Sequence, residues 1–241
     1  MTAVAVRWLT VFLDFPATSF GAGVAFWREV TGSGLSPLRG AAGEFATLLP
    51  ADGDAYLRVQ RVAGGSGGHH LDLHVDPARA SVEQTAERVV APGAKVLHRE
   101  RGLVISASPA GFTFCLVRWH GESTGPGPVR LDGAGASRAE AFWLDVPADD
   151  FERERSFWAA LTGSEGQTRA RSALPVRLEL RRAGLDDRVT GHLAFACADR
   201  RALAARHAAA GARILAVLPH ETEMADPVGR FYRLTGREMA A

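Results

Sequence analysis

The chain has 241 residues, with Lys plus Arg numbering 28 against 27 for Asp plus Glu, and neither sign gathers into a long run. That balance gives no electrostatic case for binding nucleic acid or an anionic membrane, so a small molecule becomes the expected partner. A hydrophobic content of 46% with 23% charged residues is typical of a folded globular chain, and the length allows two domains that each bury a core.

The N-terminal segment, residues 1–16, is expected to be a strand and not a targeting or membrane segment. It is apolar but contains Arg7 and Asp14, and it lacks the ~20 apolar residues of a membrane span. The two cysteines, Cys115 and Cys197, stand at no metal-finger or redox spacing. A disulfide framework is therefore not expected, and a cytoplasmic location fits best.

The first part of the chain predicts a strand, a helix and then further strands. Residues 8–15 are strand-like, and residues 19–31 carry apolar side chains at helical spacing up to Gly32, which can cap the helix. Strand-like runs follow at residues 45–49 and 55–62, punctuated by Gly and Asp.

The same order of elements then occurs a second time. Residues 69–75 alternate as a strand, and residues 79–90 form an amphipathic helix that ends before Pro92. Residues 103–108 and 112–119 predict a hairpin. The first 120 residues therefore contain two modules of strand, helix and strands.

The rest of the chain repeats this pair of modules. Residues 13–17 (LDFPA) recur 131 residues later as LDVPA, and Phe26-Trp27 recurs at the same offset as Phe157-Trp158. His70 matches His192 at the smaller offset of 122, as shortened loops in the second copy would produce. The order of the matches is kept along the whole length, which indicates a true repeat.

The two copies are separated by residues 121–138, which are rich in Gly, Pro and Ser and are expected to be a linker. We predict one domain at residues 1–120 and a second at 139–241, with helices in the second at about 149–161 and 200–210. The expected fold class is α+β, built from four βαβββ modules.

Seven segments carry a family resemblance. They are LDFPA at 13–17, AFW at 25–27, LRVQRV at 57–62, HLDLHVD at 70–76, GFTFCLV at 111–117, GHLAF at 191–195 and DPVGRFYRL at 226–234. In this order they resemble the vicinal oxygen chelate superfamily, and most closely its glyoxalase-like, bleomycin-resistance-like branch. The resemblance implies that the modules form two cupped mixed β-sheets, with helices outside and the ligand inside. It also implies that metal-using members place ligands on the first and last strand of each module.

The residues at these implied metal positions do not make a family-type ligand set. The first copy has Thr10, Gln60, His70 and Cys115, and the second has Ala141, Arg181, His192 and Arg233. Threonine is a poor ligand, and arginine has no lone pair to give a metal. We therefore expect no metal and no cofactor. An alternative keeps a divalent ion in the first copy, held by Gln60, His70 and His74.

The strand 69–75 carries the strongest candidates for chemistry. Strand periodicity places His70, Asp72 and His74 on one face. Such a face can supply an acid, a base and an orienting carboxylate, because a histidine partnered by Asp has its tautomer and pKa set near neutrality. The alternative is that these groups simply satisfy one another as polar residues that line the cup.

Further residues of the first copy are candidates for ligand binding. Arg58 and Gln60 share a strand face and could donate hydrogen bonds to a ligand, or Arg58 could pair with Asp14 or Asp72. Cys115 could act as a nucleophile, although a buried cysteine is more often a small hydrophobe.

The aromatic residues Phe12 and Trp143 occupy matching positions in the two copies, where they could stack on a ligand or fill the cup.

Several arginines converge in the second copy. Arg177, Glu179 and Arg181 share a strand face, and Arg233 is expected nearby. Arginine binds carboxylates in a bidentate manner, which would suit an anionic ligand. A lattice of ion pairs with Glu179 and Asp145 is the alternative.

These observations leave two functions open. The first is a binding or resistance-type protein that holds a small organic molecule without a metal. The second is a lyase- or isomerase-type enzyme that uses His70, Asp72 and His74 as acid and base groups. The tandem chain could work as a monomer or as a homodimer.

Overall fold

The structure, a computed structural model, describes residues 6–163, 174–183 and 188–236. The chain divides into two compact units. Unit 1 comprises residues 1–11, 69–124 and 143–191, and unit 2 comprises residues 12–68, 125–142 and 192–241. Each unit thus combines pieces of both sequence copies.

The strands of the first copy form one mixed sheet. Within the described residues its order is β2-β3-β4-β1-β5-β8-β7-β6. These strands are β1 (Val6–Pro16), β2 (Gly34–Leu35), β3 (Phe45–Leu49), β4 (Leu57–Val62), β5 (Gly68–Val75), β6 (Lys95–Glu100), β7 (Leu103–Ala107) and β8 (Thr113–Arg118). β5 and β8 run parallel, and in their register Asp72 lies opposite Cys115.

The strands of the second copy form a second mixed sheet. Among the described residues its order is β11-β10-β12-β15-β14-β13, with β9 paired to β10. The strands are β9 (Val129–Leu131), β10 (Gly135–Pro147), β11 (Arg177–Ala183), β12 (Thr190–Cys197), β13 (Arg213–Val217), β14 (Glu221–Ala225) and β15 (Phe231–Gly236). β12 and β15 are parallel, as β5 and β8 are in the first sheet.

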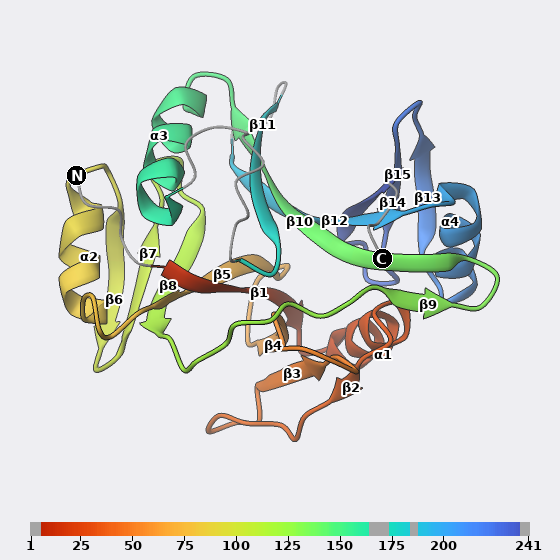
Figure 1. Cartoon of the computed structure of the whole chain (residues 1–241), viewed down its shortest axis with the longest axis horizontal. Coiled ribbons are helices and arrows are strands. Elements are labelled where there is room, and N and C mark those ends of the chain that lie inside the picture. The colour runs from red at the N-terminus through yellow and green to blue at the C-terminus, as the bar shows by residue number, and fades with distance from the viewer. Residues whose placement is uncertain (1–5, 164–173, 184–187, 237–241) are drawn as a thin grey trace. The chain divides into compact units, whose positions relative to one another are not determined.

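The helices of the described residues each pack on strands of their own unit. They are α1 (Phe20–Val30), α2 (Val82–Val90), α3 (Phe151–Thr162) and α4 (Arg200–Ala209). In unit 1, α2 packs on β6, β7 and β8, and α3 packs on β11. In unit 2, α4 packs on β13, β14 and β15, and α1 packs on β4. Figure 1 shows α2 beside β6 and α4 beside β13.

Local sequence explains where the helices begin and end. α2 starts at a capping box, in which the Ser81 side chain accepts from the Gln84 amide and the Gln84 side chain accepts from the Ser81 amide. α4 starts at Asp199, whose carboxylate accepts from the Ala202 amide. α3 ends at Gly163, which has a φ of 75°, a left-handed conformation that glycine adopts without strain.

Each unit has an aromatic core around one helical tryptophan. In unit 2, the Trp27 ring stacks on Phe195 at a centroid distance of 6.1 Å and meets Tyr232 at 5.4 Å. In unit 1, the Trp158 ring meets Phe114 at 5.4 Å. Both tryptophans are buried, which places them in the cores.

The α+β fold class of tandem βαβββ modules with two curled mixed sheets is confirmed. The helices lie within three residues of their predicted limits. The sequence pattern did not predict β2, which has two residues. It also did not predict β6 (KVLHRE), whose mostly exposed side chains give no alternation of burial. β9 and the start of β10 lie inside the expected linker at residues 121–138. The domain limits of 1–120 and 139–241 remain a prediction.

No helix in the described part of the chain is long and apolar enough to cross a bilayer.

Candidate functional site

The candidate site is the polar face of β5 in unit 1. Asp72 and His74 on this strand are buried, and His70 is partly buried. Leu71 and Leu73 alternate with them and are also buried, so both faces of the strand are covered. A strand buried on both faces is normally apolar throughout, and the three polar residues are therefore an exception to the usual composition.

His74 is held between a hydroxyl and a carboxylate. Its Nε2 atom lies 3.0 Å from Thr10 Oγ1 on β1, and its Nδ1 atom lies 3.3 Å from Glu122 Oε1. An ionised carboxylate at this distance favours a proton on Nδ1 electrostatically, and in that tautomer Nε2 would accept from Thr10. These two neighbours restrict the ring orientation of His74, and the roles of its two nitrogens depend on its tautomer.

Glu122 was not among the residues predicted from the sequence. It lies within the segment expected to be a linker, just after β8, and its Oε2 atom accepts from the His120 amide at 3.0 Å. Its carbonyl oxygen accepts from the Trp119 indole at 2.9 Å. These two bonds fold the segment back to His74. The only signal in the sequence was a carboxylate closely following a strand.

A second group lies at the other end of the same strand face. His70, Asp72 and Cys115 each offer one ligand atom, and these atoms lie within 4.8 Å of one another. His70 Nε2 and Asp72 Oδ1 are 4.0 Å apart. A nitrogen, an oxygen and a sulfur donor at this spacing could hold a Zn²⁺-like ion after small side-chain adjustments. His70, Asp72 and Cys115 thus fit a divalent metal better than the four implied positions of the first copy did in the sequence.

The other predicted residues of the first copy lie in unit 2. The Arg58 guanidinium lies over the Phe12 ring at 5.7 Å, and Phe12 meets Phe45 edge-on at 6.3 Å. Gln60 is opposite Phe45 in the register of β3 and β4. Phe12 is buried, as expected for a residue that fills space, and Arg58 has an aromatic neighbour that the sequence did not suggest.

The second copy places its arginines beside carboxylates and rings. In unit 2, Arg233 forms ion pairs with Glu221 and with Glu223, the latter at 3.2 Å. His192 is buried, with its ring 4.9 Å from that of Phe231. The sequence suggested an ion-pair lattice with Glu179 and Asp145. The glutamates that pair with Arg233 were not named, because the pairing of β14 with β15 cannot be inferred from spacing alone.

The remaining candidates of the second copy belong to unit 1. The Arg181 guanidinium lies over the half-buried Trp143 ring at 4.6 Å, and Arg177 pairs with Glu179 at 3.3 Å. The roles of all the predicted site residues remain predictions.

The family model for the glyoxalase-like domain matches the chain twice, at residues 10–117 and 130–235. A comparison of the chain with curated protein sequences found no match. Among solved structures, the chain is similar to 2,2',3-trihydroxybiphenyl 1,2-dioxygenase from Sphingomonas wittichii strain RW1. That match has 17% identity and a TM-score of 0.62, and it covers 96% of this chain and 90% of that one.

Two further solved structures have the same fold. The Mn(II)-bound glyoxalase from Novosphingobium aromaticivorans is 18% identical, with a TM-score of 0.63 and coverage of 98% of this chain and 83% of that one. A catechol 2,3-dioxygenase is 16% identical, with a TM-score of 0.57 and coverage of 95% and 92%. At these identities the likeness establishes the fold alone. With two family matches that together span most of its length, the chain belongs to the glyoxalase-like domain family of the vicinal oxygen chelate superfamily.

Proposed function

We propose that the protein binds a small organic molecule on the polar face of β5 and acts as a binding or resistance-type protein without the metal set usual in its superfamily. The observation that carries the proposal is the buried set of His70, Asp72 and His74 on one strand. Ligand pockets typically combine apolar walls with a few precisely placed polar groups that fix the orientation of the ligand. Three such groups on one buried strand face are suited to that role.

The contacts at the implied metal positions support the metal-free reading. The Thr10 hydroxyl forms a hydrogen bond with His74 Nε2, so it points toward that imidazole and not toward a metal position. In the second copy, Ala141 has no donor atom, and Arg233 is paired with glutamates. Thr10 in the first copy, and Ala141 and Arg233 in the second, therefore do not supply the strong donors that metal-using members of the superfamily place at these positions.

The charges of the site favour a ligand rich in hydroxyl groups. Asp72 and Glu122 are hydrogen-bond acceptors when ionised, whereas His70 and His74 can each donate or accept. An anionic ligand would face two carboxylates, which is unfavourable at short range. Two of the similar structures are named for enzymes acting on catechol and 2,2',3-trihydroxybiphenyl. Aromatic diols are therefore the first probes to use.

Calorimetric titration of chelator-treated protein with catechol and 2,2',3-trihydroxybiphenyl tests the proposal. We expect at least one of them to bind, and Asp72→Asn to weaken that binding about tenfold, because a hydrogen bond to a charged group contributes about 1.5–3 kcal/mol. Asp132→Asn, at an exposed turn between β9 and β10, is the matched control and should bind as the unchanged protein does. Absence of binding by any aromatic diol, or equal affinity of the Asp72 variant, would refute the proposal.

One observation favours a second candidate, a metal-assisted lyase or isomerase. The donor atoms of His70, Asp72 and Cys115 could hold a divalent ion, which would supply Lewis-acid polarisation of a substrate oxygen. His74, held by Thr10 and Glu122, would move a proton at Nε2.

Cobalt substitution separates the two candidates. A thiolate bound to Co²⁺ gives a near-ultraviolet charge-transfer band, which Cys115→Ser should remove while Cys197→Ser keeps it. Less than one equivalent of bound Co²⁺, with no such band, would discard the metal-assisted candidate and leave the metal-free proposal standing.

We further propose that the protein works in the cytoplasm as a monomer or a homodimer. Cys115 and Cys197 form no disulfide with each other, which is consistent with a reducing compartment. Light scattering on a sizing column distinguishes the two oligomeric states.

A further inference from the structure

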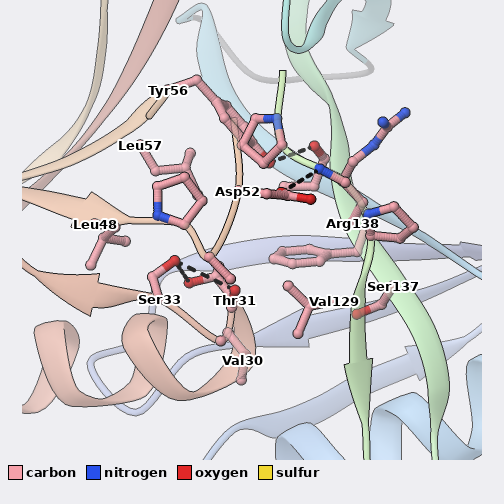
Figure 2. Close-up of a pocket in the computed structure, with 18 of the residues that line it drawn as sticks. Val30, Thr31, Ser33, Leu48, Asp52, Tyr56, Leu57, Val129, Ser137 and Arg138 are labelled. Atoms are coloured by element: carbon pink, nitrogen blue, oxygen red, sulfur yellow. Dashed lines mark hydrogen bonds between the residues drawn. The ribbon is translucent and has the colours of Figure 1, made fainter. Parts of the chain in front are cut away.

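A cavity of about 230 Å³ lies in unit 2. Figure 2 shows its walls. They come from the end of α1, the segment before β4, the expected linker and the start of β10. Its apolar lining includes Val30, Leu48, Leu57, Val129 and Phe195. The segment that the sequence suggested was a plain linker therefore builds one side of a binding-sized space.

Two hydrogen bonds fix the walls of this cavity. The Tyr56 hydroxyl donates to the Ala139 carbonyl oxygen at 2.9 Å, and Asp52 Oδ1 accepts from the Gly127 amide at 2.9 Å. Both bonds join the segment before β4 to the linker or to β10, and both are drawn in Figure 2. Burial raises the pKa of Tyr56, so its hydroxyl stays protonated and remains a donor. The cavity is thus formed before any ligand arrives.

A close approach of backbone to side chain closes the end of the cavity. Gly32 has a φ of 59°, and a Cβ atom placed there would lie 2.7 Å from Val129 Cγ1. Only glycine therefore lets the end of α1 pack so near β9. Val129 is opposite Ser137 in the antiparallel pairing of β9 with β10, which puts both side chains on the same face of the ribbon.

Ser137 supplies an unused polar group at this wall. The residue is only 1% exposed, and within the described part of the chain its Oγ atom has no hydrogen-bond partner. Leaving a buried hydroxyl unsatisfied costs about 1–3 kcal/mol. The neighbouring Arg138 alternates to the opposite face of β10, and Figure 2 shows its guanidinium pointing away from Ser137. The hydroxyl is therefore a polar contact that this wall offers to an occupant.

We propose that this cavity is a binding site for a neutral, single-ring aromatic molecule that carries one hydrogen-bonding substituent. A cavity of about 150 Å³ lined by apolar side chains is large enough for benzene, so the present volume of about 230 Å³ leaves room for a ring and a substituent. Asp52 on one side and Arg130 and Arg138 on the other also line the cavity, so an ion of either sign would meet a like charge, which favours a neutral ligand. Ser137 Oγ hydrogen-bonds the substituent. The site is independent of the function proposed for β5.

Fluorine NMR of the full-length protein with 4-fluorophenol, fluorobenzene and 4-fluorobenzoate tests this proposal. We expect 4-fluorophenol to bind most tightly and 4-fluorobenzoate least. Ser137→Ala should weaken 4-fluorophenol about three- to tenfold, the usual effect of one neutral hydrogen bond, and change fluorobenzene less than twofold. Because the substitution removes an unpartnered hydroxyl, the variant should fold normally.

Ser106→Ala is the matched control, since Ser106 is another buried hydroxyl without a hydrogen-bond partner among the described residues and does not line this cavity. It should leave every affinity unchanged. The proposal is overturned if no fluoroaromatic binds, which would indicate a cavity filled by water alone. Tighter binding of 4-fluorobenzoate than of 4-fluorophenol, or equal effects of the two serine variants, would overturn it as well.

Discussion

In each unit a buried carboxylate connects a helical tryptophan to the turn before a strand by hydrogen bonds, but the carboxylate comes from a different element in the two units. In unit 2, the Trp27 indole on α1 donates to Asp226 in the turn before β15, at 2.9 Å. In unit 1, the Trp158 indole on α3 donates to Glu154 of the same helix at 2.8 Å, and Glu154 accepts from the Ala110 amide in the turn before β8 at 2.8 Å. Both carboxylates are fully buried.

The repeat offsets show that the carboxylate has moved between two equivalent positions. Glu154 corresponds to Gly23 at the offset of 131, and Asp226 corresponds to Ser108 at the offset of 118. A side chain at Gly23 is excluded, because a Cβ atom there would lie 2.4 Å from the Phe15 ring. Each unit therefore has one buried carboxylate that accepts from its indole. In unit 2 it lies on the turn, because the helix has no space for a side chain at Gly23. In unit 1 it lies on the helix, because the turn has a serine at the equivalent position.

The largest expected effect comes from removing the turn carboxylate of unit 2. Asp226 also accepts from the Val228 and Arg230 amides, at 3.0 and 2.8 Å, and lies 3.9 Å from the buried Arg230 guanidinium. Burial lowers the pKa of Arg230, and Asp226 opposes that shift. Asp226→Ala should lower the free energy of unfolding by about 3–5 kcal/mol, because the Trp27 indole and two backbone amides lose their acceptor together and Arg230 loses a nearby negative charge.

Urea unfolding measures this effect, with Asp132→Asn at an exposed turn as the control. A loss below about 1 kcal/mol would mean that the turn does not depend on its carboxylate.

The second-largest expected effect is a loss of stability at acidic pH, because unit 2 buries a histidine where unit 1 has valine. His207 on α4 corresponds to Val89 on α2 at the offset of 118, and its Nδ1 atom lies 3.0 Å from the Tyr232 hydroxyl. Burial, and secondarily Arg206, lowers the pKa of His207 from 6.5 to about 4. Between these values the unfolded chain binds more protons than the folded one, so stability falls as the pH drops through this window.

Acidification from pH 7 to 4 should therefore remove up to about 3 kcal/mol of stability through His207 alone. The double variant His207→Val, Tyr232→Phe gives unit 2 the pair that unit 1 has in Val89 and Phe114. We expect it to lose this part of the pH dependence in urea unfolding followed from pH 7 to 4. An unchanged pH slope would show that other groups dominate.

A smaller effect is expected from the helix carboxylate of unit 1. Glu154→Gln keeps the size of the side chain but turns one acceptor oxygen into a donor, so either the Trp158 indole or the Ala110 amide loses its partner. We expect a loss of about 2 kcal/mol in the free energy of unfolding.

The comparison also predicts a rescue. In a Glu154→Ala background, Ser108→Asp places a carboxylate where unit 2 has Asp226, and it should recover about 1 kcal/mol. Thr113→Asp, on the adjoining strand β8, tests whether the new charge alone is responsible. Failure of Ser108→Asp to stabilise this background would contradict the equivalence of the two turns.

Much of the fold could be predicted because helical and strand periods and the repeat are local properties of the sequence. The alternation at residues 69–75 was enough to place His70, Asp72 and His74 on one face. Contacts such as that of Glu122 with His74 could not be found in this way, because they depend on how a loop returns after its strand.

The sequence also did not predict which modules form each unit. Each unit takes one module from each copy, and no periodicity states which module packs on which. For the same reason the cavity walled by the linker near Ser137 was not foreseen.

The most direct test of the proposed function asks which copy holds the ligand. Calorimetric titration of the tightest-binding aromatic diol into the Asp72→Asn and Arg233→Gln variants compares the polar face of β5 with the paired arginine of β15. We predict about tenfold weaker binding for Asp72→Asn and less than twofold change for Arg233→Gln. The reverse pattern would contradict the proposal and place the ligand in the second copy.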